Sequence, residues 1–386
     1  MSFVDTLLSS NRLLQRRVKL NTCSGLERHL LDELHDLSLK FDLVARDKSN
    51  IDILASLDTI WSIIQNSRIC RQLSIHVCDP FQAETTKQLV KNLNSADWAS
   101  FIPFSNKLST PSIKITSHNS KLYHTGMIQN ILEGVINSHC YRYKKIQGDE
   151  LPEFMKTRGY VPICPKITVD VSNNGCQVLA DASGDLSERP WHKLSLVEDR
   201  IVPSASAAVI QELASRNVFN RPVIWDPFCH NGSLLLELAS YLKDEKMRIE
   251  SSKYPLTNNA NEMLTKLKAI EEENATPLLD DEDTHVKSST TNPLTLKFEC
   301  KRVNEVSFNM KDVVILTNWY YGNKQMKSLY STYCKDFSKF VKSVKSRCNS
   351  IYAIAPKSFK RISGLNCETL LIFNNNGIIV ELMKLS

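Results

Sequence analysis

The sequence predicts two structural parts, an α+β first half and an α/β second half built on a largely parallel sheet. In the first half, strand-like segments at 166–171 and 176–181 flank Asn173-Asn174-Gly175, a turn sequence typical of a β-hairpin. From about residue 200, strand-like and helix-like segments alternate, which is typical of a parallel sheet. The length of 386 residues allows two or three domains.

Residue spacing predicts each element of the first half. A strand begins at Val18, and Ser24-Gly25-Leu26-Glu27 starts a helix whose leucines recur at helical spacing: Leu26, Leu30, Leu31, Leu34 and Leu37. A second helix carries Leu57, Ile60, Trp61 and Ile64. The stretch from Leu73 to Val77 alternates like a strand, and helices are expected at 81–93 and 120–139, with a strand at 113–115 between them.

The second half is predicted to be a series of strands and helices. A helix is expected at 205–213, a strand at 313–317, a helix near 328–345, a strand at 351–354 and two final strands. Between 243 and 293 the chain is polar and net acidic, with Glu271-Glu272-Glu273 and Asp280-Asp281-Glu282-Asp283. We interpret this segment as a solvated insertion.

The composition is that of an ordinary globular protein, with 42% hydrophobic and 23% charged residues. The net charge of +6 is compatible with a nucleic-acid partner. The 11 cysteines include no CxxC pair, so a zinc finger is excluded and no metal site is expected. Their odd number predicts reduced thiols in an intracellular compartment, and no apolar run approaches the roughly 18 residues that a membrane helix needs.

The first 17 residues carry Arg12, Arg16 and Arg17 against one acid, Asp5. This composition fits either an organellar presequence or a short N-terminal extension. Because a strand is expected from Val18, we assign residues 1–17 to an extension. The choice between the cytoplasm and an organelle stays open.

The most informative segment, 223–239, reads as a strand, a small-residue loop and a helix. Such a unit brings a strand end and a helix N-terminus together, where backbone N–H groups face a polar ligand. Asp226 ends the strand, and Gly232 lets the backbone approach a cofactor because glycine has no Cβ. Ser233 supplies a hydroxyl or caps the helix, and a helix-capping role is the alternative for Asp226.

A basic stretch covers residues 323–361, where ten Lys and Arg residues face one acid, Asp336. Lys335, Lys339 and Lys342 lie three to four residues apart, so they share one helix face. This face is either a contact surface for RNA phosphates or an ordinary solvated surface. We also expect Arg189 to contact RNA.

Four segments in consistent order resemble the THUMP-bearing RNA methyltransferases, and most closely the RlmL-type bacterial large-subunit ribosomal RNA guanine-N2 methyltransferases. Residues 21–27 resemble the opening strand, turn and helix, and 116–135 resemble the later THUMP region. Residues 179–186 resemble the connection to the catalytic domain. Asp226 to Glu237 resembles the cofactor loop, written D-P-x-C-G-S-G-T-L-L-I-E in that family.

The resemblance implies a ferredoxin-like piece and a THUMP domain for RNA at 18–172, then a Rossmann-like methyltransferase domain at 173–386. It implies S-adenosylmethionine as the cofactor and the exocyclic N2 amine of guanine as the acceptor, with large-subunit ribosomal RNA as the expected partner. Two alternatives stay open. One is a non-catalytic RNA-binding relative, and the other is a methyltransferase acting on another substrate, such as transfer RNA or a protein amide.

The resemblance also assigns site residues. The cofactor-binding set is Asp226, Pro227, Cys229, Gly232, Ser233 and Asp281, where Asp281 matches the carboxylate that binds the ribose hydroxyls. Where the family has Gly in the loop, this chain has His230. An acid that binds adenine follows the third strand in the family, and Glu299 is the nearest acid here.

The catalytic signature Asn-Pro-Pro-Tyr of the amine methyltransferases corresponds to residues 318–321, and the catalytic set is Asn318, Trp319 and Tyr321. The Asn318 side-chain oxygen and the next backbone carbonyl would accept the amine hydrogens, while Tyr321 stacks on the flipped base. Trp319 and Tyr320 replace both prolines, which fix φ in the family.

Overall fold

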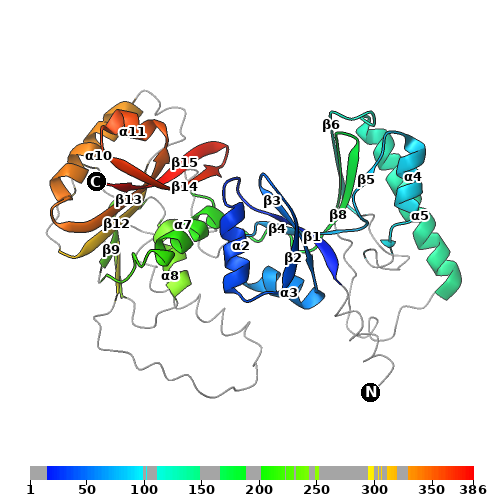
Figure 1. Cartoon of the computed structure of the whole chain (residues 1–386), viewed down its shortest axis with the longest axis horizontal. Coiled ribbons are helices and arrows are strands. Elements are labelled where there is room, and N and C mark those ends of the chain that lie inside the picture. The colour runs from blue at the N-terminus through cyan, green and yellow to red at the C-terminus, as the bar shows by residue number, and fades with distance from the viewer. Residues whose placement is uncertain are drawn as a thin grey trace, which may run out of the picture. The chain divides into compact units, whose positions relative to one another are not determined.

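The structure is a computed structural model of the 386-residue chain (Figure 1). It describes residues 15–98, 101, 111–147, 166–187, 201–221, 223–229, 232–242, 248–251, 294–299, 303, 306, 311–319 and 329–386, with the backbone alone at 140–147 and 248–251. The chain divides into two compact units. The first comprises Met1–Asn21 and Leu34–Leu186, and the second comprises Thr22–Glu33 and Ser187–Ser386.

One sheet organises the first unit, with the strand order β2-β3-β1-β4-β8-β7-β6 and β5 paired to β8. Its strands are β1 (Arg16–Asn21), β2 (Phe41–Asp47), β3 (Asn50–Ala55), β4 (Gln72–His76), β5 (Phe81–Gln82), β6 (Ile113–His118), β7 (Ile167–Ser172) and β8 (Gly175–Asp181). The helices that lie between these strands in the sequence are α2 (Glu27–Asp36), α3 (Leu57–Asn66), α4 (Thr86–Asn94) and α5 (Thr125–Gln147). Residues Glu27–Glu33 of α2 belong to the second unit.

Strand β7 shows how the sequence alternation produces a core on one face of this sheet. Ile167, Val169 and Val171 are fully buried, whereas the residues between them are half-buried, because successive strand side chains point to opposite faces. The buried residues pack in one cluster with the apolar faces of α4 and α5, which include Leu89, Leu93, Ile128 and Leu132.

The predicted hairpin near residue 174 is confirmed, but it corrects our domain boundary. β7 pairs antiparallel with β8, and β8 also pairs with β4, so β8 belongs to the first sheet. Asn173 and Asn174 both have positive φ (51° and 64°), as a tight two-residue hairpin turn requires. The strands of such a hairpin share one sheet, so the boundary lies between Leu186 and Ser187 and not at 172/173.

Two further predictions for the first unit need correction, and one hairpin was missed. β1 begins at Arg16, and Arg17 donates to Asp52 at 2.8 Å, so both arginines belong to the sheet and not to an extension. The expected helix at 81–93 is a short strand followed by α4, whose N-cap Thr85 forms a capping box with Gln88. The hairpin of β2 and β3 was not predicted, because most residues of β2 are exposed.

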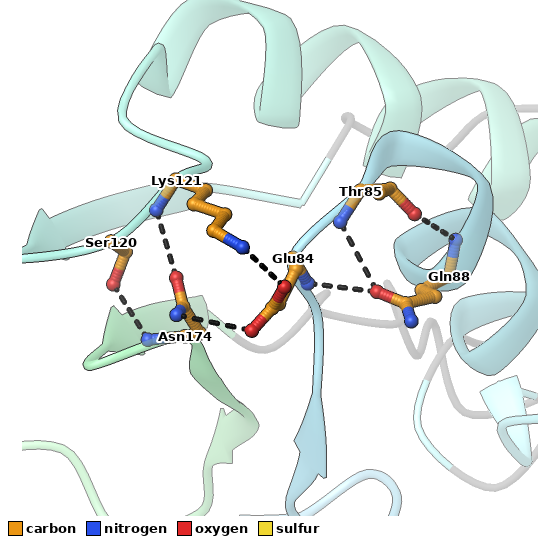
Figure 2. Close-up of polar contacts among 6 residues, drawn as sticks. All are labelled: Glu84, Thr85, Gln88, Ser120, Lys121 and Asn174. Carbon is orange, nitrogen blue, oxygen red and sulfur yellow. Dashed lines mark hydrogen bonds and ion pairs between the residues drawn. The ribbon is translucent and has the colours of Figure 1, made fainter.

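Loops at one end of the first unit are joined by side chains (Figure 2). Glu84, just before α4, receives the Lys121 ammonium group at 2.5 Å, and Lys121 N–H donates to Asn174 Oδ1 at 2.8 Å. Asn174 N–H donates to Ser120 Oγ at 3.0 Å. The turn before α4, the loop before α5 and the β7–β8 turn are therefore held in one arrangement.

The second unit contains a mostly parallel sheet in the order β10-β11-β9-β12-β13-β15-β14. Its strands are β9 (Val223–Asp226), β10 (Arg248–Ser251), β11 (Thr295–Phe298), β12 (Val313–Asn318), β13 (Cys348–Pro356), β14 (Cys367–Asn375) and β15 (Ile378–Leu385). β15 is antiparallel to both of its neighbours. The helices are α7 (Pro203–Ser215), α8 (Ser233–Leu242), α10 (Tyr330–Val344) and α11 (Ser358–Ser363).

The strand order of this sheet contains a topological switch point. From β9, the chain adds β10 and β11 on one side and then β12 and the later strands on the other side. In doubly wound sheets, ligands bind in the crevice outside the carboxyl ends of the strands at such a reversal. A ligand site is therefore expected at the carboxyl ends of β9 and β12. The predicted alternation of strands and helices is confirmed, although most of the acidic segment 243–293 lies outside the described residues.

Candidate active site

The structure brings together the two segments that sequence analysis assigned to cofactor and catalysis. β9 and β12 are hydrogen-bonded parallel neighbours, with Val313 opposite Val223 and Ile315 opposite Trp225. Asp226 is the last residue of β9 and Asn318 is the last residue of β12. Both therefore lie at the same edge of the sheet, next to the switch point.

Backbone hydrogen bonds hold the loop after β9. Asp226 Oδ1 accepts the Phe228 N–H at 3.1 Å, which makes a tight turn over Pro227. The Cys229 N–H donates to the Glu299 carbonyl at 2.9 Å, and the Glu299 N–H donates to the Asp226 carbonyl at 2.9 Å. The loop is thus attached on both sides to the residue that follows β11.

Gly232 is required by its conformation and by a close neighbour. Its φ is +73°, in the left-handed region that residues with a Cβ rarely adopt. A Cβ added there would lie 3.2 Å from Cδ1 of Phe298, a buried residue of β11. The glycine predicted to give close access to a ligand therefore also packs closely against the Phe298 side chain of β11.

Helix α8 begins directly after this loop, at Ser233. The Gly232 carbonyl accepts the first helical bond from Leu236 N–H at 3.0 Å, and Ser233 is buried. The positive end of the helix dipole and the first N–H groups of α8 therefore lie at the end of β9, where they favour a negatively charged or polar ligand group.

Asp226 has an unusual electrostatic environment. Its side chain is almost completely buried, and this burial raises the pKa of its carboxyl group to about 7, although the Thr317 side chain and the Phe228 N–H favour the charged form. Burial therefore favours the protonated form of this carboxyl group, which can donate as well as accept a hydrogen bond.

Glu299 is a second acidic residue at this edge of the sheet. It follows β11 directly, and β11 is the strand that pairs with β9 on the side away from β12. The residue is 5% exposed, and Lys297 Nζ lies 3.4 Å from its Oε1. Asp281, to which the resemblance gave the ribose-binding role, lies outside the described residues. In the sequence, the alternation of Leu296 and Phe298 directly before Glu299 was the signal that could have predicted an acidic residue at the end of a strand.

At the end of β12, Asn318 is 8% exposed and Trp319 is 4% exposed. The Trp319 ring stacks on Phe337 of α10, with centroids 4.1 Å apart and planes 20° apart. A side chain packed in this way cannot face a substrate, so the backbone of Trp319 is the part that can serve the predicted catalytic role. Tyr321, Tyr320 and His230 lie outside the described residues.

The predicted basic face exists as an exposed surface. Lys335, Lys339 and Lys342 are all exposed on α10, while Phe337, Phe340 and Val341 of the same helix are buried. Lys339 Nζ lies 3.0 Å from Asp336 Oδ1, so its charge is partly balanced. Arg189 falls outside the part of the chain that the structure describes.

Two other kinds of feature are absent from the described ranges. No group of three or more His, Cys, Asp or Glu side chains is placed to hold a metal ion there. Among the same residues, no helix combines the length and the apolar character needed to span a membrane.

Comparisons with known proteins identify structural relatives only. No family model and no curated protein sequence matches the chain. SMU.472, a candidate methyltransferase solved in complex with SAH, is 16% identical, and the match covers 96% of this chain and 97% of that protein with a TM-score of 0.68.

Two further structures match to a similar extent. A predicted N6-adenine-specific DNA methylase from Listeria monocytogenes is 14% identical, with 98% of this chain and 97% of that chain covered and a TM-score of 0.68. TrmN from Thermus thermophilus is 14% identical, and the match covers 96% of this chain and 99% of that chain with a TM-score of 0.62. At these identities the likeness shows the fold, and the predicted α+β part followed by a Rossmann-like α/β part is confirmed.

Proposed function

We propose that this protein is an S-adenosylmethionine-dependent RNA methyltransferase that modifies guanine N2, with large-subunit ribosomal RNA as its substrate. The observation that carries this proposal is the adjacency of β9 and β12, which puts the Asp226 loop beside Asn318. The fold shared with SMU.472, which was solved with SAH, supports the choice of cofactor.

The described residues fit such a cofactor. Gly232 has no Cβ, so no side chain at this position blocks a ligand from the backbone. The N-terminus of α8 offers backbone N–H groups, and Asp226 offers a carboxyl group. We assign Glu299 as a second carboxylate at this edge, because carboxylates at strand ends accept hydrogen bonds from ribose hydroxyls. When bound, the cofactor supplies an electrophilic methyl group.

The protein's own part in the reaction is to hold the acceptor amine. The Asn318 side-chain oxygen and the following backbone carbonyl accept the two amine hydrogens and orient the nitrogen lone pair toward the methyl group. No strong general base is needed, because the amine loses its proton after attack. We keep Tyr321 as the proposed stacking residue for the everted base.

The RNA part of the proposal rests on the THUMP-like segments in the first unit and on the exposed lysines of α10. A specific observation favours a second candidate, an RNA-binding protein without catalytic activity. Trp319 and Tyr320 stand where the amine methyltransferases have two prolines.

Calorimetry with S-adenosylmethionine and SAH separates the two candidates. A methyltransferase should bind both, with dissociation constants in the range from about 1 μM to about 1 mM that is typical of enzyme substrates. Mapping of N2-methylated guanines in ribosomal and transfer RNA from cells lacking the protein then identifies the substrate. Absence of binding at roughly millimolar cofactor would instead support the non-catalytic candidate.

The basic face of α10 gives a prediction of its own. We expect the double reversal Lys335→Glu with Lys342→Glu to weaken RNA binding and to reduce the slope of log affinity against log salt by about 0.7–0.9 per lost phosphate contact. Reversal of Lys339 should do less, because Asp336 already balances part of its charge.

Lys311→Glu with Lys384→Glu is the matched control, since both lysines are exposed and the change in net charge is the same. Filter binding over a range of salt concentrations measures all of these variants. Equal losses in the two double variants would show that α10 is an ordinary solvated surface.

A further inference from the structure

An aromatic contact connects the two segments of the candidate active site. Phe228, in the loop after β9, lies 5.2 Å from Trp319, the residue after β12, with the two rings nearly perpendicular at 83°. Edge-to-face pairs at this spacing attract each other through their ring quadrupoles. Phe337 packs against both rings, at 4.1 Å from Trp319 and 5.6 Å from Phe228.

The backbone of Trp319 is also held in place. Its N–H donates to the Ile354 carbonyl of β13 at 2.9 Å, directly after the pair formed by Asn318 and Ile354 in the parallel register. This bond fixes the peptide that joins Asn318 to Trp319. A proline at this position would fix φ but could not donate the bond.

Phe228 transmits the contact to the cofactor loop. Its N–H donates to Asp226 Oδ1 at 3.1 Å, and its ring is buried with Trp319 and Phe337 in one cluster. Any displacement of the Trp319 ring therefore acts on the turn that starts at Asp226.

We propose that Trp319 is a positioning residue that couples the amine-holding segment after β12 to the cofactor loop after β9. The ring provides this coupling through Phe228, while the N–H anchors the segment to β13 through the Ile354 carbonyl. The consequence for methyl transfer rests on the proposed function, whereas the coupling itself is a property of the fold. Buried aromatic packing would then take over the restraint that proline rings supply in the related motif.

The test compares Trp319→Leu and Trp319→Phe with Phe359→Leu. Phe359 is a fully buried member of the same core cluster and packs on Phe337 at 5.8 Å, so its truncation controls for a general loss of core packing. Circular dichroism and thermal unfolding first establish that each variant is folded.

Amide hydrogen exchange without any ligand is the primary measurement. In Trp319→Leu, a peptide covering residues 226–233 should exchange at least about fivefold faster than in wild type, because the ring that holds Phe228 is lost. Trp319→Phe should fall between wild type and the leucine variant. In Phe359→Leu, exchange of this peptide should stay within twofold of wild type on the same scale.

Single-turnover kinetics give the second measurement. We expect Trp319→Leu to lower the rate of methyl transfer by about tenfold to a hundredfold, with cofactor affinity changed by less than about threefold, because misplaced groups lose orientation before they lose binding. The double variant with Phe228→Leu should lose less than the product of the single losses, as expected for residues in contact.

Unchanged exchange of the 226–233 peptide in Trp319→Leu would overturn the coupling. Equally fast exchange of this peptide in Phe359→Leu would also overturn the coupling, because any loss of core packing would then have the same effect as the loss of the Trp319 ring. Neither outcome depends on catalysis. Failure of the wild-type protein to bind the cofactor would instead count against the proposed function and leave the exchange result valid.

Discussion

Replacing Asn318 by alanine should lower the rate of methyl transfer by about a hundredfold to a thousandfold, the loss seen when one preorganised polar group is removed from an active site. Asn318 is the last residue of β12, at the edge next to Asp226, and it is 8% exposed. Its side-chain oxygen is the acceptor that would orient the amine. Without it, the lone pair is not directed toward the methyl group.

The effect should be confined to the chemical step. Binding of the cofactor and of RNA should change by less than about threefold, since those contacts are assigned to the 226–233 loop and to other surfaces. Asn349→Ala is the matched control, because Asn349 is exposed near the start of β13. Single-turnover assays together with calorimetry measure both quantities. Full activity in Asn318→Ala would place the catalytic site elsewhere.

The second large effect is expected at Gly232. Changing it to alanine puts a residue with a Cβ in the left-handed region, which costs about 1–2 kcal/mol of stability. The new Cβ also lies 3.2 Å from the Phe298 ring, and this crowding costs about 1–3 kcal/mol more. Either the Phe298 ring or the loop must move by a few tenths of an ångström to relieve the contact. We therefore expect lower stability and at least a tenfold loss of cofactor affinity, which corresponds to about 1.4 kcal/mol.

Gly364 provides a control that separates these two costs. Its φ of +63° is similar, but a Cβ there would meet nothing within 4 Å. Gly364→Ala should therefore show the conformational cost alone and should leave cofactor affinity unchanged. Denaturant unfolding and calorimetry give the comparison. Equal destabilisation by the two variants would show that the contact with Phe298 contributes nothing.

Much of the second unit could be predicted from the sequence because its signals are local. Apolar runs and helical spacing indicated β12, α10 and β13, and the Asp-Pro turn with its glycine indicated the loop before α8. β2 was not predicted, because its residues are mostly exposed and lack a clear alternation of apolar and polar side chains. It also placed the domain boundary inside a hairpin, although Asn173-Asn174-Gly175 had been recognised as a turn.

The sequence by itself determined which segments are strands and helices in most of the chain, and it picked out Asp226, Gly232 and Asn318 as residues worth testing. Only the tertiary structure decided that β9 and β12 are neighbours, that Glu299 follows a strand paired with β9, and that the Trp319 ring lies in the core. The physical reason is that periodicity and turn chemistry act over a few residues. Strand order and ring packing depend on contacts between segments that lie far apart in the chain.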